Sequence, residues 1–218
     1  MDITWLGHSA IRVRTRSAAV VMEPAARSEG VEMGRPAAAI VTVSHDHPAH
    51  AHAAGVRGDP VVLRRPGEYE IEGVQLLGVA TRLGPVRSGG DAAPRAAEGR
   101  NVVFVVEAEQ LRLAHLGGMG IPPTHGEMEQ LADINVLVIP VGGESALAAS
   151  AAARMTRELD PRVVIPVCYV RDGSGQSAEL SAYLTALGID AEEPVSRLTI
   201  QRRGLGETTR VLLLESRG

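Results

Sequence analysis

Short apolar and β-branched runs, separated by glycine or serine, open the chain and predict a succession of β-strands. The first three runs cover residues 3–6, 11–15 and 19–22. Residues 38–43 form a nearly continuous apolar run, which is typical of a strand buried on both faces. Further strands are predicted at residues 61–63, 70–71 and 74–80, with Pro66-Gly67 as a turn between the first two.

The second half of the chain mixes strand and helix patterns. Residues 101–107 and 111–115 predict a β-hairpin, residues 136–141 and 163–167 predict buried strands, and residues 198–202 and 210–214 predict a closing hairpin. Thr124 and Glu127 form a capping-box pattern that opens a short helix toward Leu131. Alanine-rich residues 145–159, and residues 177–187 with Gly188 at the C-terminal cap, predict two more helices. Buried strands alternating with helices predict an α/β fold in which packed sheets carry helices outside.

No repeat or linker divides the chain, so we expect one domain over residues 1–218. Residues 84–100 are rich in Gly, Ala, Pro and Arg and have no apolar period, which predicts a mobile loop.

Composition narrows the classes of function. The formal net charge is -4, which does not favour a nucleic-acid partner. No apolar run is long enough to span a membrane, and the first residues lack the pattern of a signal peptide. The single cysteine, Cys168, cannot form an internal disulfide, which fits a cytoplasmic protein. All 22 basic side chains are arginine, and the lack of lysine excludes Schiff-base chemistry.

Three histidines follow the buried strand at residues 38–43. His45, His47 and His50 lie within six residues, and alternation turns the first two to one side of the chain while directing Asp46 away from them. Imidazole is a preferred ligand of zinc and similar ions, so this spacing indicates a metal site. Pro48 suits a first helical turn, and a short helix is predicted over residues 49–54.

Segments spread over nearly the whole chain resemble the metallo-β-lactamase superfamily, in the branch that includes ascorbate-6-phosphate lactonase and related zinc-dependent hydrolases. The resemblance implies a four-layer αββα sandwich with the metal site at the edge where the two sheets meet. It rests on the following segments: Trp5-Leu6-Gly7-His8-Ser9, Val43-Ser44-His45-Asp46-His47, Pro66-Gly67-Glu68-Tyr69-Glu70-Ile71, His115-Leu116-Gly117, residues 138–143 and Val164-Ile165-Pro166.

Four of the seven ligand positions implied by the resemblance are altered. The family signature His-x-His-x-Asp-His is matched by the three clustered histidines, but an alanine replaces its aspartate. Another histidine, the bridging aspartate and the last histidine are also replaced. The residues at the altered positions are Ala49, Leu83, Gly118 and Cys168. The aspartate that usually precedes a proline after the third strand is Glu23, beside Pro24.

Loss of these carboxylates argues against a two-metal site. Two divalent ions about 3.5 Å apart repel by roughly 20 kcal/mol at an effective dielectric constant near ~20. We therefore expect at most one zinc ion, or none, with His45, His47, His50 and Cys168 as the metal ligands.

The remaining histidines have simpler interpretations. His8 and His115 are expected to hold neighbouring loops or to pack near the site, and His52 and His125 are expected to be solvated.

Two hypotheses of function follow from the sequence. The first is a mononuclear zinc hydrolase of ester, lactone or phosphoester bonds. The second is a non-catalytic descendant of the fold that binds a small molecule or a protein partner. The sequence assigns no catalytic residue, substrate or oligomeric state.

Overall fold

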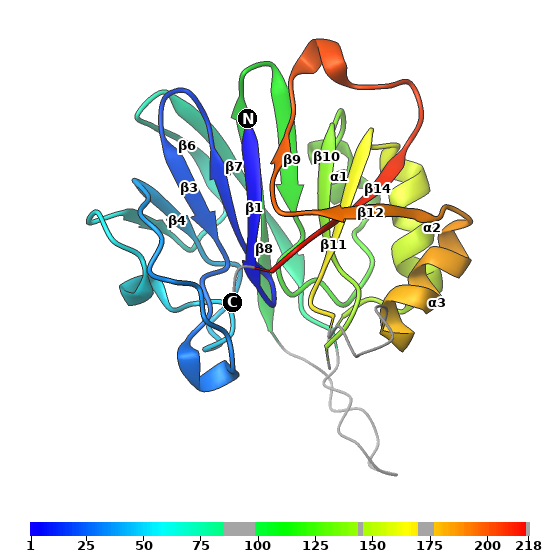
Figure 1. Cartoon of the computed structure of the whole chain (residues 1–218), viewed down its shortest axis with the longest axis horizontal. Helices are drawn as coiled ribbons and strands as arrows, with labels where there is room; N and C mark the ends of the chain where they lie inside the picture. The colour runs from blue at the N-terminus through cyan, green and yellow to red at the C-terminus, as the bar shows by residue number, and fades with distance from the viewer. Residues whose placement is uncertain (85–98, 144–145, 170–176, 217–218) are drawn as a thin grey trace.

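Two mixed β-sheets lie face to face, and the longer helices cover the outer face of one of them (Figure 1). The structure is a computed structural model, and it describes residues 1–84, 99–143, 146–169 and 177–216. Most of the predicted mobile loop, residues 85–98, lies outside the described residues.

Six strands of the described chain form the first sheet, in the order β13-β1-β2-β3-β4-β5. The strands from β13 to β3 run antiparallel, whereas β3, β4 and β5 run parallel. Their bounds are β1 Asp2–Gly7, β2 Ala10–Arg14, β3 Ala19–Met22, β4 Ile40–Thr42, β5 Val61–Leu63 and β13 Leu198–Thr199.

The second sheet has eight strands within the described residues, in the order β12-β14-β11-β10-β9-β8-β7-β6. Strands β6, β7, β8 and β9 form an antiparallel meander. Strands β9, β10, β11, β14 and β12 follow in that order, and each pairs in parallel with the next. Their bounds are β6 Gly67–Ile71, β7 Val74–Arg82, β8 Arg100–Ala108, β9 Leu111–His115, β10 Val136–Pro140, β11 Val163–Val167, β12 Ala191–Val195 and β14 Arg210–Leu214.

Helices α2 (Ala149–Leu159) and α3 (Ala178–Leu187) pack together beside the parallel half of the second sheet (Figure 1). Helix α1 (His125–Gln130) has the predicted capping box at Thr124, and α3 begins after Ser177 and ends at Gly188 as expected. Short 3-10 helices complete the chain at η1 Arg27–Glu29, η2 Ala53–Gly55 and η3 Arg202–Gly204. None of the helices in these described segments is long and apolar enough to cross a membrane.

The predicted sandwich is confirmed, and apolar side chains fill the spaces between its layers. The main core joins inward residues of both sheets, such as Ile3 and Ile11 of the first and Leu76 and Phe104 of the second. A smaller cluster covers the outer face of the first sheet, where Val21 and Val41 pack under Met33 and Val56. Loops and the η1 and η2 turns therefore supply the outer layer on this side, where the αββα description places helices.

Two local predictions are wrong, and one strand was missed. The segments predicted as a closing hairpin separate, because β13 pairs with β1 in the first sheet while β14 pairs with β11 and β12 in the second. Strand β12 was not predicted, since its sequence Ala-Glu-Glu-Pro-Val has weak strand propensity and depends on pairing with β14. The helix expected over residues 49–54 is replaced by a hydrogen-bonded turn and the η2 turn.

Candidate metal centre

A cavity of about 550 Å³ opens where the carboxyl ends of β4, β10 and β11 meet. Ligand sites in sheets with parallel strands usually form at this end of the strands. Hydrogen bonds tie the sheets together beside it: Cys168 N–H donates to His8 O at 3.0 Å, and Val102 N–H donates to Ser44 O at 2.9 Å. The residues that line the cavity include His8, His45, Asp46, His47, His50, Leu83, Gly118, Gly142 and Cys168.

The three clustered histidines meet at this cavity. The ring centroids of His45 and His50 are 4.3 Å apart, and that of His47 lies 6.0 Å from each of them. A tight turn brings His50 back, because the backbone N–H groups of His50 and Ala51 both donate to His47 O at 2.8 Å. Strand β4 ends at Thr42, so strand alternation no longer applies at Asp46, and this exposed residue lines the cavity instead of pointing away as expected.

Glu23 lies directly behind His50. Its Oε2 is 2.8 Å from Nδ1 of His50, and the Glu23 side chain is buried. Backbone N–H of Ser44 donates to Oε1 of Glu23 at 2.7 Å, which holds the carboxylate in place. An ionised carboxylate only accepts hydrogen bonds, so His50 then carries its hydrogen on Nδ1 and keeps a lone pair on Nε2. A metal-binding histidine commonly has such a carboxylate partner on its other nitrogen.

Ser44 extends the same arrangement to His45. The hydroxyl of Ser44 donates to Oε2 of Glu23, and its oxygen lies 2.8 Å from Nδ1 of His45. Since the single hydroxyl hydrogen is directed to Glu23, Ser44 Oγ accepts the Nδ1 hydrogen of His45. Nε2 of His45 therefore also keeps its lone pair. Metal-binding atoms of Glu23, His45 and His50 lie within 4.8 Å of one another, and no other such group of three occurs among the described residues.

His47 is held differently. Its side chain is exposed, and its Nδ1 accepts the backbone N–H of Ala49 at 3.1 Å. A neutral imidazole that accepts at Nδ1 carries its hydrogen on Nε2. His47 must break the bond to Ala49 before its Nε2 can bind an ion.

Burial keeps His8, His45 and His50 uncharged at neutral pH. Burial first, and then the neighbouring histidines, lower the pKa of His8, His45 and His50 to about 4. Burial raises the pKa of Glu23, while His115 and the hydrogen bonds from Ser44 oppose that rise. Neutral imidazoles at pH 7 offer lone pairs without first releasing a proton.

Two cavity residues, and Glu23 behind them, adopt left-handed backbone conformations although they are not glycines. The φ angles are 50° at His8, 56° at Glu23 and 60° at Cys168. Such conformations cost energy and are concentrated at functional sites, where surrounding contacts maintain them. The carbonyl of His8 provides such contacts, since it accepts both the indole N–H of Trp5 at 2.7 Å and the backbone N–H of Cys168.

Cys168 lines the same cavity, as its place in the family pattern requires. Its side chain is buried, and burial raises the pKa of the thiol to about 12, against a hydrogen bond with Ser9 that lowers it. The thiol is therefore protonated at neutral pH. The structure places Cys168 outside the group formed by Glu23, His45 and His50, so its role as a ligand stays a prediction.

His115 has a structural role, as expected. It is buried, its Nε2 donates to Ser9 O at 2.8 Å, and its Nδ1 accepts the backbone N–H of Gly117 at 3.0 Å. Both ring nitrogens are thus engaged and neither is available to an ion. The predicted solvated histidines, His52 and His125, are exposed and lie outside the cavity.

The altered ligand positions also meet at the cavity, where they leave little room for more ligands. A Cβ added at Gly118 would lie 2.6 Å from Cε1 of His45 and 2.8 Å from Cδ2 of Leu83. Leu83 and Met119 form an isolated β-bridge that holds this wall. Ala49 is buried beside the histidines. These contacts show that His45 and Leu83 occupy the space that an aspartate side chain at residue 118 would need.

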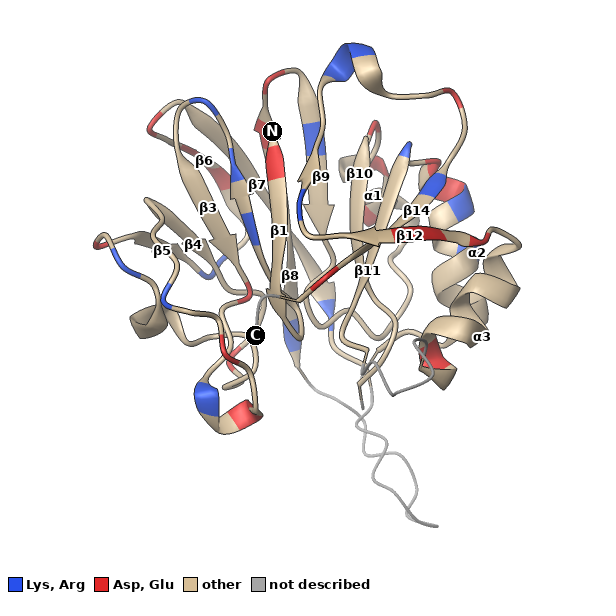
Figure 2. Cartoon of the chain, viewed as in Figure 1, with Lys and Arg blue, Asp and Glu red and all other residues tan. Residues whose placement is uncertain are grey.

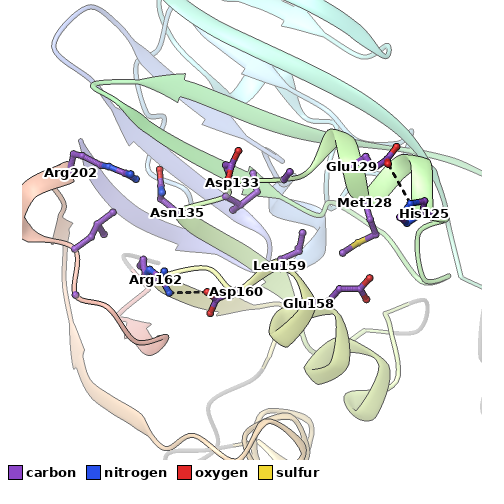
Figure 3. Close-up of a pocket in the computed structure, with 14 residues that line it drawn as sticks. His125, Met128, Glu129, Asp133, Asn135, Glu158, Leu159, Asp160, Arg162 and Arg202 are labelled. Carbon is purple, nitrogen blue, oxygen red and sulfur yellow. Dashed lines mark hydrogen bonds and ion pairs between the residues drawn. The ribbon is translucent and has the colours of Figure 1, made fainter.

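A larger cavity, of about 630 Å³, lies at the opposite ends of β10 and β11 (Figure 3). Four of the side chains around it form two pairs, the 3.0 Å ion pair of Arg162 with Asp160 and the 3.3 Å contact of His125 with Glu129. No described residues there form a group suited to a metal ion. The smaller histidine cavity is therefore the stronger candidate for chemistry.

Sequence comparisons identify distant relatives over most of the chain. The chain is 24% identical to the UPF0173 protein of Pyrococcus furiosus over 186 residues, covering 78% of this chain and 83% of that protein. It is 26% identical over 193 residues to a UPF0173 metal-dependent hydrolase of Pyrobaculum neutrophilum, covering 78% of this chain and 84% of that protein.

Comparison of folds agrees with these relatives. A crystal structure from Thermotoga maritima, described as a Zn-dependent hydrolase of the metallo-β-lactamase superfamily, matches with a TM-score of 0.77 and 28% identity over 99% of both chains. The β-lactamase superfamily domain family matches residues 2–168. Since that match covers most of the chain, the protein belongs to the β-lactamase superfamily domain family.

Proposed function

We propose that this protein is a hydrolase of ester, lactone or phosphoester bonds that uses a single zinc ion. The observation that carries the proposal is the pair of neutral imidazoles, His45 and His50, whose Nδ1 atoms are engaged by Ser44 and Glu23 and whose Nε2 atoms are left free. A relative from Pyrobaculum neutrophilum is named as a metal-dependent hydrolase, and the similar Thermotoga maritima protein as a Zn-dependent one.

The residues at the cavity suit one ion better than two, although His47 and Cys168 would have to move to join His45 and His50, because neither belongs to the group of donors that lie within 4.8 Å of one another. His45 and His50 supply two nitrogen donors, His47 supplies a third once it leaves Ala49, and the Cys168 thiolate supplies a fourth of opposite charge. A second ion needs bridging carboxylates to offset the repulsion between two cations. Ala49 and Gly118 stand where the family has those carboxylates, and Glu23 is turned to the far side of His50.

The cavity supplies the remaining requirements for hydrolysis. When bound, a zinc ion polarises a carbonyl or phosphoryl oxygen and makes water a stronger acid. Among the described residues, Asp46 and Glu29 are the carboxylates that line the cavity, and both are exposed and able to accept a proton from an attacking water. A volume of about 550 Å³ is sufficient for a small-molecule substrate.

A second candidate is a small-molecule binding protein without catalytic activity. The observation that favours it is the replacement of ligands at Ala49, Leu83 and Gly118, which leaves an apolar wall where the family has polar side chains. The backbone still shapes the cavity, since a Cβ at Gly142 would collide with Cys168 O. Gly142 therefore allows the close approach of two backbone segments at the cavity wall.

Metal content and turnover separate the two candidates. The protein is purified without a polyhistidine tag, analysed for metals, titrated with zinc, and assayed on p-nitrophenyl acetate and phosphate esters. His45→Ala and His50→Ala are compared with His125→Ala, which removes an exposed histidine of α1.

One zinc ion per chain, with turnover that disappears in the two cavity variants and persists in the control, is the expected result. Zinc binding without turnover of any ester supports the binding protein instead. Two tightly bound ions, or no zinc binding at all, contradict the single-ion site.

A further inference from the structure

A second groove, of about 450 Å³, lies on the outer face of the first sheet and shares no lining residue with the histidine cavity. The face is set by strand alternation: Ile3 and Ile11 point into the main core, so Asp2, Arg12 and Arg14 point outward. Five arginines line this groove: Arg12, Arg14, Arg35, Arg57 and Arg197.

Separate parts of the chain bring these arginines together. Arg12 and Arg14 alternate along β2, opposite Thr4 and Asp2 of β1. Arg57 lies beside the residue 35–37 loop, because Ala37 and Arg57 form an isolated parallel bridge. Arg197 directly precedes β13, which pairs with β1 on its other side. Figure 2 shows basic segments beside β1 and around β4 and β5.

No ion pair neutralises the five arginines within the part of the chain that the structure describes. The groove holds one acidic residue, Asp2, whose Oδ1 accepts a hydrogen bond from Thr199 at 2.8 Å. The groove is therefore strongly positive on a chain whose formal net charge is -4. A bound anion would offset the mutual repulsion of these cations.

Two of the guanidinium groups are positioned without being neutralised. Nε of Arg12 donates to Ala37 O at 3.1 Å, and Nε of Arg57 donates to Arg35 O at 3.0 Å. Each bond fixes one nitrogen on an uncharged carbonyl and leaves the two terminal nitrogens available. A fixed guanidinium fork matches two oxygens of a phosphate group.

We propose that this groove binds a small, multiply charged phosphate anion, of the size of a diphosphate. Several negative charges on adjacent phosphoryl groups match several arginine forks within a space of about 450 Å³. A long nucleic acid is a poorer match, because it would extend from the groove over the rest of a surface with net negative charge.

Isothermal titration of the full chain with inorganic diphosphate at low ionic strength tests the site. Diphosphate also binds metal ions, so the protein is first stripped of metal. His50→Ala is included as a control for binding at the histidine cavity, because it alters that cavity and not the groove. Arg12→Ala and Arg57→Ala are each expected to weaken binding by about tenfold or more. Arg154→Ala, which removes an exposed arginine of α2, is the matched control and is expected to bind like the unaltered chain.

Arg12→Lys tests whether the guanidinium fork is needed in addition to the positive charge. This variant keeps the charge and is expected to bind diphosphate more weakly than the unaltered chain. Each variant is checked by thermal unfolding, and Arg14→Gln with Arg197→Gln replaces any variant that does not fold. The proposal is overturned if diphosphate does not bind, if Arg154→Ala weakens binding as much as Arg12→Ala, or if sulfate binds equally well. It is also overturned if a single-stranded oligonucleotide binds more tightly than diphosphate and depends on the same arginines.

Discussion

Nδ1 of His50 lies 2.8 Å from Oε2 of Glu23, so a buried carboxylate orients an imidazole that faces the cavity. The sequence places these residues 27 positions apart and gives no sign of their contact. The parallel pairing of β3 with β4 brings them together, since Glu23 follows β3 and donates its backbone N–H to Thr42 O at 3.0 Å.

Replacing Glu23 with glutamine is expected to weaken zinc binding by about tenfold to a hundredfold, because carboxylate partners of metal-binding histidines typically contribute that much. Zinc titration with a competing chelator measures the change. Glu29→Gln is the control, since Glu29 is exposed, lines the same cavity and accepts its side-chain hydrogen bond from Ser28 and not from a histidine ring. Equal losses in both variants would show that only the overall charge of the cavity matters.

His47 is expected to contribute less to zinc affinity than His45 or His50. The bond between its Nδ1 and Ala49 N–H must break before Nε2 can bind, and that cost reduces the net gain. His47→Ala should therefore weaken binding less than His45→Ala or His50→Ala in the same titration. A loss at His47 as large as that at His50 would contradict the tautomers deduced from the hydrogen bonds.

Cys168 is expected to make zinc affinity depend on pH. The pKa of His45 and His50 is about 4, so above about pH 6 these imidazoles release no proton on binding. The thiol pKa is raised to about 12, so a thiolate ligand must release a proton, and affinity rises about tenfold per pH unit. Cys168→Ser should bind more weakly and lose this slope between about pH 6 and about pH 9. Equal binding and equal slopes would remove Cys168 from the ligand set.

Restoring the family ligands should restore a second ion. The variant that combines Ala49→Asp, Leu83→His, Gly118→Asp and Cys168→His is expected to bind two ions per chain by elemental analysis. Gly118→Asp alone should destabilise the fold, since its Cβ would lie 2.6 Å from His45 and 2.8 Å from Leu83. A folded combined variant with no more metal than the unaltered chain would show that these positions do not correspond to the family ligands.

Tyr183 is expected to make the fold sensitive to alkaline pH. Burial raises its pKa from 10.0 to about 12, and its hydroxyl lies 2.8 Å from Thr156 Oγ1 between α3 and α2. The folded chain holds this proton where the unfolded chain has lost it, so stability is full below about pH 10 and falls by about 3 kcal/mol as pH rises toward about 12.

Urea unfolding at about pH 8 and about pH 11 measures this loss in Tyr183→Phe and the unaltered chain. Tyr183→Phe should be less stable by about 1 kcal/mol at the lower pH, through loss of the hydrogen bond, and should lose less stability on going to the higher pH. Tyr69→Phe, at a half-buried tyrosine of β6, should keep the full alkaline loss. An unchanged alkaline loss in Tyr183→Phe would contradict the assignment.

Local sequence determined most of the elements. Apolar runs and turn residues placed β1, β2, β3, β10 and β11 to within a few residues. Strands β10 and β11 are buried along their whole length and have an apolar residue at every position, whereas β1 and β2 alternate apolar residues of the core with polar residues of the outer face. Capping also acts locally, so the start of α1 at Thr124 and the end of α3 at Gly188 could be predicted. Segments along the whole chain resembled one superfamily, and the fold agrees.

Tertiary structure decided how the ends of the chain pair and how the site is supported. Strand β12 and the separation of β13 from β14 depend on partners far away in the sequence, which local propensity does not record. The spacing of His45, His47 and His50 indicated a metal site, but only the fold distinguishes two oriented imidazoles from the one held by Ala49. Glu23 acts through a contact between two parallel strands, and such a contact exists only once the sheet has formed.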